Sequence, residues 1–260
     1  MMGKKLSGFL LLFFALSSFA QQSEMDLGTT HYLKRSEGAS EDLVALPENI
    51  NKAITHFTNA LSDSTTEAAA VHQLLKCYYF KGNCVETEKD KKLVVYNESV
   101  KLGEDMVAKY PNSVHIRYWL LVNKAKWGET SGIMKAARSG LADKLKTLCE
   151  EVIELDPNYL DGAAYMMLGI VHYKTPYIPF ILSWPDDDDA IEYLEKSVEL
   201  QPGHLMSNLY LGQVLYDEGF KDRGLEILEA VSASKPGEEY PLEDEKDIRF
   251  SRVMLEKYRK

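Results

Sequence analysis

The sequence is poor in cysteine and has none of the short motifs typical of common catalytic or metal sites. Its 260 residues include three cysteines, Cys77, Cys84 and Cys149, too few for a disulfide framework. The six histidines form no HExxH signature, and no two cysteines form a CxxC pair. GxSxG elements, glycine-rich phosphate loops and dinucleotide fingerprints are also missing. We therefore expect no enzyme, no metal site and no cofactor.

Basic residues are also scarce. Thirty lysines and arginines stand against 40 aspartates and glutamates, which gives a net charge of −10. Because such a surface repels phosphate backbones and anionic lipid, it argues against nucleic-acid and membrane-surface roles. An apolar content of 45% is enough for a large core, in one extended array or in two small domains.

The first 20 residues have the pattern of a cleavable signal peptide. Lys4 and Lys5 precede an apolar run over residues 6–19, and Ser18 and Ala20 are the small residues expected before a cut at Gln21. The run is short for a bilayer span, although an uncleaved anchor helix is the alternative. No cysteine near the cut offers a lipid anchor. We expect a periplasmic or secreted protein without a membrane anchor.

Sustained alternation of apolar and polar residues is absent, so strands are not expected. Residues 21–42 are polar and aperiodic, which predicts a mobile segment. From residue 43 to 260 the apolar residues recur at steps of three and four, as Val71, Leu75 and Tyr78 do. This spacing predicts an all-α domain.

The predicted helices repeat along the chain. Similar segments end at Pro111, Pro157, Pro202 and Pro236, with intervals of 46, 45 and 34 residues. Since proline cannot continue a helix, each marks the gap between two helix pairs. The last interval is the length of a tetratricopeptide repeat. We expect about ten helices in an α-solenoid of antiparallel pairs, with a capping helix near residues 243–258.

Small residues stand where the helices of one pair would cross. Gly169 and Ala190 occupy these positions in one repeat, and Gly212 and Gly224 do so in the next. A larger side chain there would push the two helices apart, so these four residues are predicted structural contacts.

Two stretches give the chain a more specific resemblance. Residues 153–169 (IELDPNYLDGAAYMMLG) and 190–200 (AIEYLEKSVEL), with the proline-bearing insertion between them, resemble the T component of TRAP transporters. The resemblance is strongest over residues 145–235. It implies a periplasmic, non-enzymatic, tetratricopeptide-like protein that associates with a solute-binding subunit and offers an apolar channel to a small ligand.

The insertion over residues 173–185 is unusually apolar for a loop with three prolines. Its aromatic residues and those of neighbouring helices form the candidate ligand- or partner-binding set: Trp119, Trp127, Tyr165, His172, Tyr173, Tyr177, Phe180 and Trp184. The alternative is that these rings only close the core, and that His172 has a structural role. Two functions follow: a module that binds a protein partner or apolar ligand, or an assembly subunit that forms homo-oligomers through the insertion.

Two further features have two readings each. Asp186 to Asp189 precede a predicted helix, where carboxylates cap the exposed N–H groups; a calcium site is the alternative. Cys77 and Cys84 could pair if the chain turns back after the helix that holds Cys77. Cys149 lies on an apolar helix face and is predicted to be a buried free thiol.

Overall fold

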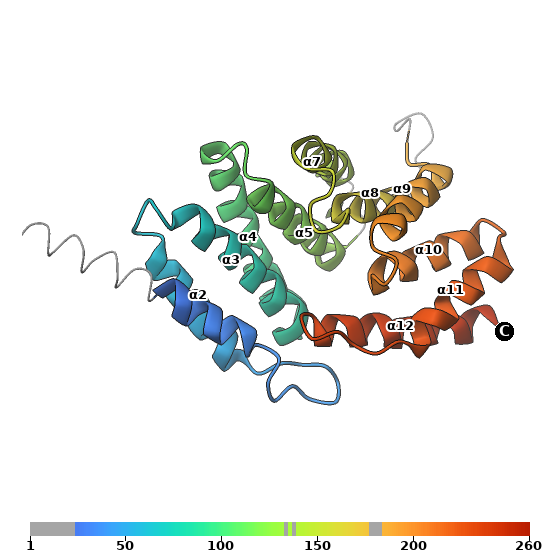
Figure 1. The fold of residues 1–260 in the computed structure, drawn as a ribbon, viewed down its shortest axis with the longest axis horizontal. Helices are drawn as coiled ribbons and strands as arrows, with labels where there is room; N and C mark the ends of the chain where they lie inside the picture. Colours follow the sequence, from blue (N-terminus) through green and yellow to red (C-terminus); the bar gives the residue numbers. More distant parts are fainter. Residues whose placement is uncertain (1–23, 133–134, 137–138, 177–183) are drawn as a thin grey trace, which may run out of the picture. The chain divides into compact units, whose positions relative to one another are not determined.

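A computed structural model describes residues 24–132, 135–136, 139–176 and 184–260. The predicted signal peptide and the candidate residues Tyr177 and Phe180 lie outside these ranges. All regular secondary structure in the described ranges is helical, which confirms the predicted all-α architecture (Figure 1). No helix in them is long and apolar enough to cross a bilayer.

The chain divides into two compact units, residues 1–123 and 124–260. The first contains a helix over residues 24–33, followed by α2 (Pro47–Ala60), α3 (Glu67–Phe80), the π-helix η1 (Lys81–Val85), α4 (Lys89–Lys109) and the start of α5 (Val114–Ser131). The second contains the end of α5, then α7 (Leu141–Leu155), α8 (Ala163–Lys174), α9 (Asp187–Leu200), α10 (Leu205–Asp217), α11 (Lys221–Ala233) and α12 (Pro241–Tyr258).

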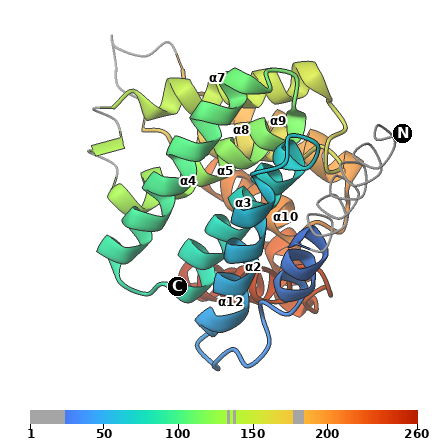
Figure 2. The same ribbon diagram turned by 90° about the vertical axis from the view of Figure 1, so that its left-hand side faces the viewer.

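In the N-terminal unit α2, α3 and α4 pack side by side (Figures 1 and 2). Ile50 and Phe57 of α2 and Leu74 and Leu75 of α3 are almost completely buried. Ile50 and Phe57 are seven positions apart, and Leu74 and Leu75 are adjacent. Each helix therefore turns one apolar stripe toward its neighbour. The stripe predicted from the spacing is thus the core of this unit.

Within the segment 21–42, which the sequence predicts to be mobile, residues 24–33 form a helix. Tyr32 is only 6% exposed, and the Glu24 carboxylate lies 2.8 Å from Nδ1 of His56 on α2. This short polar helix packs on α2, where Gly28 meets the ring of Phe57. It acts as the first helix of a further pair.

The C-terminal unit shows the close crossings that the small residues predicted. A Cβ atom at Gly169 would lie 2.6 Å from Cγ of Leu194 and 3.0 Å from the Ala190 carbonyl oxygen. At the next crossing, a Cβ atom at Gly224 would lie 2.7 Å from the Gly212 carbonyl oxygen. Contacts this short leave no room for a methyl group, so glycine allows each pair to pack backbone against backbone.

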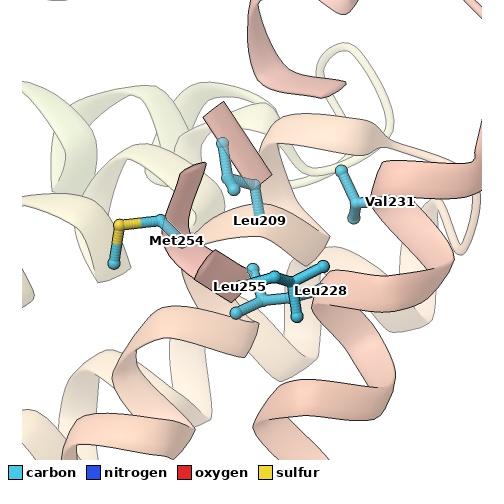
Figure 3. Close-up of a cluster of buried hydrophobic side chains, with 5 residues drawn as sticks. All are labelled: Leu209, Leu228, Val231, Met254 and Leu255. Atoms are coloured by element: carbon cyan, nitrogen blue, oxygen red, sulfur yellow. The ribbon is translucent and has the colours of Figure 1, made fainter. Parts of the chain in front are cut away.

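The helix α12 closes the C-terminal unit. A buried cluster of five apolar side chains joins it to α10 and α11: Leu209, Leu228, Val231, Met254 and Leu255 (Figure 3). The helix begins at Pro241, where the fixed φ of proline suits a first helical turn. The capping helix predicted near residues 243–258 is therefore present.

The three cysteines are buried free thiols. Because α3 continues into η1 instead of turning back, the geometry needed to pair Cys77 with Cys84 does not arise. Burial raises the pKa of Cys77 and of Cys149, which keeps both as thiols. The expectation for Cys149 is confirmed.

Candidate interaction surface

Charged and aromatic side chains from four helices of the C-terminal unit gather in one region. We call this region the polar face and define it by eight residues: Lys126 and Glu129 of α5, Tyr173 and Lys174 of α8, Tyr210 and Asp217 of α10, and Asp247 and Tyr258 of α12. Among these helices, α10 contacts both α8 and α12.

Lys174 is an exposed residue of this face, and its ammonium group lies against two rings. Its Nζ lies 4.1 Å from the ring centroid of Tyr173 and 5.2 Å from that of Tyr210. Partial burial of the ammonium group lowers the pKa of Lys174, and the nearby Asp217 carboxylate partly opposes this shift. No carboxylate of the described residues forms an ion pair with it. The two rings hold a cation that is open to an incoming acidic group.

Asp217 fixes the position of two tyrosines. Tyr173 donates a hydrogen bond to its Oδ2 at 2.5 Å, and Tyr258 donates one to its Oδ1 at 3.2 Å. Tyr258 also stacks on Tyr216, with ring centroids 3.7 Å apart. Burial, followed by the bond to Asp217, raises the pKa of Tyr173, so the phenol stays protonated as a donor. These contacts hold α8, α10 and α12 in a fixed arrangement.

Lys126 and Asp247 form a second charged group on the polar face. Lys126 is 26% exposed, and its Nζ lies 2.9 Å from Oε2 of Glu129. Burial lowers the pKa of Lys126, but Glu129 and then Tyr210 and Asp247 outweigh this effect and raise the pKa overall.

Asp247 is the more unusual member of that group. Burial raises the pKa of Asp247 to about 7, with Lys126 opposing the shift and Asp244 and Glu243 adding to it. The carboxyl group makes no hydrogen bond with another described residue. It is therefore partly protonated near neutral pH.

A second cluster surrounds His172, which is 2% exposed. Its ring lies 5.3 Å from that of Trp184 and 5.5 Å from that of Tyr193. Its Nδ1 accepts a hydrogen bond from the Asp186 N–H at 3.4 Å, while its Nε2 has no partner among the described residues. Burial lowers the pKa of His172, so the ring is held neutral.

The structure distributes the predicted aromatic set over several sites. It brings His172 and Trp184 together and places Tyr173 on the polar face. Trp119 belongs to the N-terminal unit, where it is 5% exposed and lies 5.5 Å from Tyr79. Trp127, in the C-terminal unit, has Lys135 Nζ 5.4 Å from its ring.

Tyr165 lies apart from these residues, beside α9. It lines a shallow, open depression with Glu192, Tyr193, Glu195, Lys196 and Glu199. Six residues of the polar face were not among the predicted ones: Lys126, Lys174, Tyr210, Asp217, Asp247 and Tyr258. No local pattern marks them, because they lie on four different helices and come together only through packing.

The acidic run before α9 is a helix cap. Asp186 accepts hydrogen bonds on Oδ1 from the N–H groups of Asp188 at 2.8 Å and Asp189 at 3.3 Å. Among the described residues, no group of three histidines, cysteines, aspartates or glutamates is arranged to hold a metal ion. The capping interpretation is confirmed.

Comparison with known proteins supports the fold. No protein-family model and no curated protein matches the chain. The structure is similar to TTC0263, a tetratricopeptide protein of Thermus thermophilus, with a TM-score of 0.58, 16% identity and coverage of 92% of this chain and 98% of that one. It is also similar to yeast Tom70, with a TM-score of 0.52, 14% identity and coverage of 98% of this chain and 45% of that one. The chain therefore has a tetratricopeptide-like solenoid fold.

Proposed function

We propose that this chain is a non-enzymatic interaction module that binds an extended segment of a protein partner across the polar face. The observation that carries the proposal is the ammonium group of the exposed residue Lys174, which lies over the rings of Tyr173 and Tyr210. An exposed cation on an aromatic platform attracts a carboxylate while the rings offer apolar contact area.

The fixed geometry of the polar face favours binding. Tyr173 and Tyr258 are already oriented by their bonds to Asp217, so little rotamer freedom is lost when a partner docks. Asp247 accepts a hydrogen bond when ionised and donates one when protonated, which adds a polar contact some distance along the segment. The chemistry suits a short acidic peptide with apolar side chains beside its carboxylates.

The resemblance of residues 145–235 to the T component of TRAP transporters supports a setting for this role. We place the protein in the periplasm, with a solute-binding subunit as the partner. The basic start and apolar run before Gln21 support the same compartment.

A second candidate function is uptake of a small apolar ligand beside His172. The observation in its favour is the buried Nε2 of His172, which has no partner among the described residues, on a ring that contacts the rings of Trp184 and Tyr193. A ligand with one acceptor atom and an apolar body would satisfy that donor. Quenching of tryptophan fluorescence by such a ligand, lost in a Trp184→Leu variant, would support this function.

The main proposal is tested with an array of random decapeptides, followed by fluorescence anisotropy on the peptides that bind. We expect enrichment of acidic peptides. The variant Lys174→Glu should weaken their binding tenfold or more, about 1.4 kcal/mol, because it replaces attraction by repulsion.

The matched control is Lys144→Glu, which makes the same charge change at an exposed lysine of α7 away from the polar face. It should leave peptide affinity within about twofold of the natural chain, since surface charges far from a site act weakly in salt. An equal loss of peptide affinity in both variants would show that only the net charge of the protein matters. Unchanged binding in Lys174→Glu would overturn the proposed site.

A further inference from the structure

The last helix, α12, carries an apolar stripe that faces away from the rest of its unit. Ile248, Ser251 and Leu255 are buried against α10 and α11. On the other side of the helix, Phe250 is 42% exposed and Val253 is 57% exposed. The two residues are three positions apart, so they form one continuous patch on the helix surface.

The N-terminal unit also exposes large apolar side chains at its first helix pair. Leu27 is 42% exposed and Leu33 is 72% exposed, both on the side of the 24–33 helix away from the buried Gly28 and Tyr32. Leu46, which precedes α2, is 52% exposed. Single exposed leucines are ordinary, but a group on the terminal pair of a helix stack is not, because terminal repeats usually present a polar outer face.

The two apolar patches have opposite charge. Residues 24–48 hold six acidic and two basic residues. The helix α12 holds five acidic and four basic residues in all, but most of the acidic ones lie in its first turns, and residues 246–260 hold six basic and two acidic residues. The basic excess at the C-terminal end is a local reversal in a chain whose net charge is −10. Around the patch on α12, Lys246 and Lys257 extend the stripe at steps of four residues on either side. Asp26, Glu37 and Glu48 are exposed near the patch at the N-terminal end.

We infer that the acidic, apolar N-terminal end of one copy docks on the basic, apolar outer face of α12 in another copy. Two N-terminal ends, or two C-terminal ends, would repel each other, since like charges would face each other in such a symmetric pairing. Opposite ends combine apolar burial with charge complementarity. The contact is heterologous, so it leaves one free end on each copy and allows further copies to add.

This inference does not depend on the proposed peptide site. Asp247 and Tyr258 of the polar face point toward α5, α8 and α10, whereas Phe250 and Val253 lie on the outer side of α12. It also differs from assembly through residues 173–185, because neither end includes that segment. Loss of one activity leaves the other measurable.

The test is size-exclusion chromatography with light scattering on the chain as processed and purified from cells. We expect a mean mass that rises with protein concentration up to about 0.5 mM, as for weak association. The mass should fall toward that of one copy in about 1 M salt, where charges are screened beyond ~3 Å.

Two variants separate this arrangement from other modes of assembly. The first variant, Phe250→Asp with Val253→Asp, introduces charge into the apolar patch of the C-terminal end only. The second variant, Leu27→Lys with Leu33→Lys, does the same at the N-terminal end only. Each should be monomeric alone. An equimolar mixture should form a 1:1 dimer, because the intact N-terminal end of the first variant fits the intact C-terminal end of the second.

The control is Val94→Asp on α4, a valine as exposed as Val253 but outside both ends. It should assemble as the natural chain does, and helical circular dichroism should be the same for all variants. A natural chain that stays monomeric throughout, self-association of either variant alone, or no dimer in the mixture would each overturn the inference.

Discussion

Gly28 lies directly against the ring of Phe57, and a Cβ atom at position 28 would be 2.6 Å from Cε1 of that ring. Phe57 is fully buried on α2, so the ring cannot move into solvent to make room. The 24–33 helix therefore docks on α2 through the same device that joins the later helix pairs, a glycine where two helices approach closely. This pair extends the repeat pattern toward the N-terminus.

The first prediction is that Gly28→Leu releases the 24–33 helix from α2 while the rest of the N-terminal unit stays folded. Overpacking at such a contact costs about 1–3 kcal/mol, enough to open a terminal element that has few other contacts. Hydrogen exchange should show lost protection at residues 24–33 only. Thr29→Leu, one position along on the exposed side, should keep that protection. Equal loss in both variants would show that the crossing at Gly28 is not what holds the helix, since leucine favours a helix more than either original residue does.

The second prediction concerns the crossing of α8 with α9. Gly169→Ala adds one methyl group 2.6 Å from Cγ of Leu194, so the two helices must separate. We expect unfolding by urea to show a loss of about 1–3 kcal/mol, even though alanine favours a helix more than glycine does. Gly203→Ala is the control, because a Cβ atom there meets nothing within 4 Å. A more stable Gly169→Ala variant would contradict the crossing geometry.

These glycines show how far sequence reasoning reaches in this fold. The crossings at Gly169 and Gly212 could be predicted because each follows a repeat-ending proline by a similar interval. Gly28 was missed because no such proline precedes it, and because the polar residues around it resemble those of a loop. A helix that borrows its apolar surface from α2 leaves a weak pattern in its own sequence.

The candidate site was less predictable for a geometric reason. Tyr165 and Tyr173 stand on the same helix but eight residues apart, about 12 Å along its axis, so they meet different neighbours, Tyr193 and Asp217. The choice of residues by aromatic type alone ignored this separation. Lys174 and Asp247 were passed over because single charges on helices are common, and only packing shows which are partly buried.

The third prediction tests the cap of α9. Asp186→Ala removes the acceptor for the N–H groups of Asp188 and Asp189 and should cost about 1 kcal/mol in urea unfolding. Asp186→Asn keeps an acceptor oxygen and should lose less than half of that amount. Addition of calcium or of a chelator should leave the unfolding midpoint of the natural chain unchanged. A midpoint that rises with calcium would restore the metal-site interpretation.

The fourth prediction concerns acid. Burial, then the charges of Lys76 and His115, lower the pKa of His72 to about 3, from an ordinary value of 6.5. The folded state therefore keeps the ring neutral while the unfolded state takes up a proton below pH 6.5. Stability due to this group is present above pH 6.5 and is lost as the pH falls toward 3.

His72→Gln should remove that dependence. We expect the natural chain to lose about 1–2 kcal/mol more than the variant between pH 7.5 and 5. The comparison uses urea midpoints at both pH values. The unfolding transition is monitored by the fluorescence of Trp119, which lies in the same unit. An identical acid loss in the two proteins would show that His72 is not the group that titrates.

The last prediction has the opposite sign. Burial raises the pKa of Asp247 to about 7, from an ordinary value of 3.8, so the folded state favours the protonated carboxyl. Its contribution to stability is fully present below pH 3.8 and is lost as the pH rises through 7. Asp247→Asn, which is neutral at every pH, should therefore be more stable than the natural chain at pH 8, by about 1–2 kcal/mol, and show little advantage at pH 4. Lys126→Met removes the cation that opposes the shift, so it should raise the pKa of Asp247 further and move the loss of stability to higher pH. If Asp247→Asn instead destabilises the C-terminal unit at pH 8, the ionised carboxylate is a stabilising partner of Lys126, and the desolvation argument for Asp247 fails.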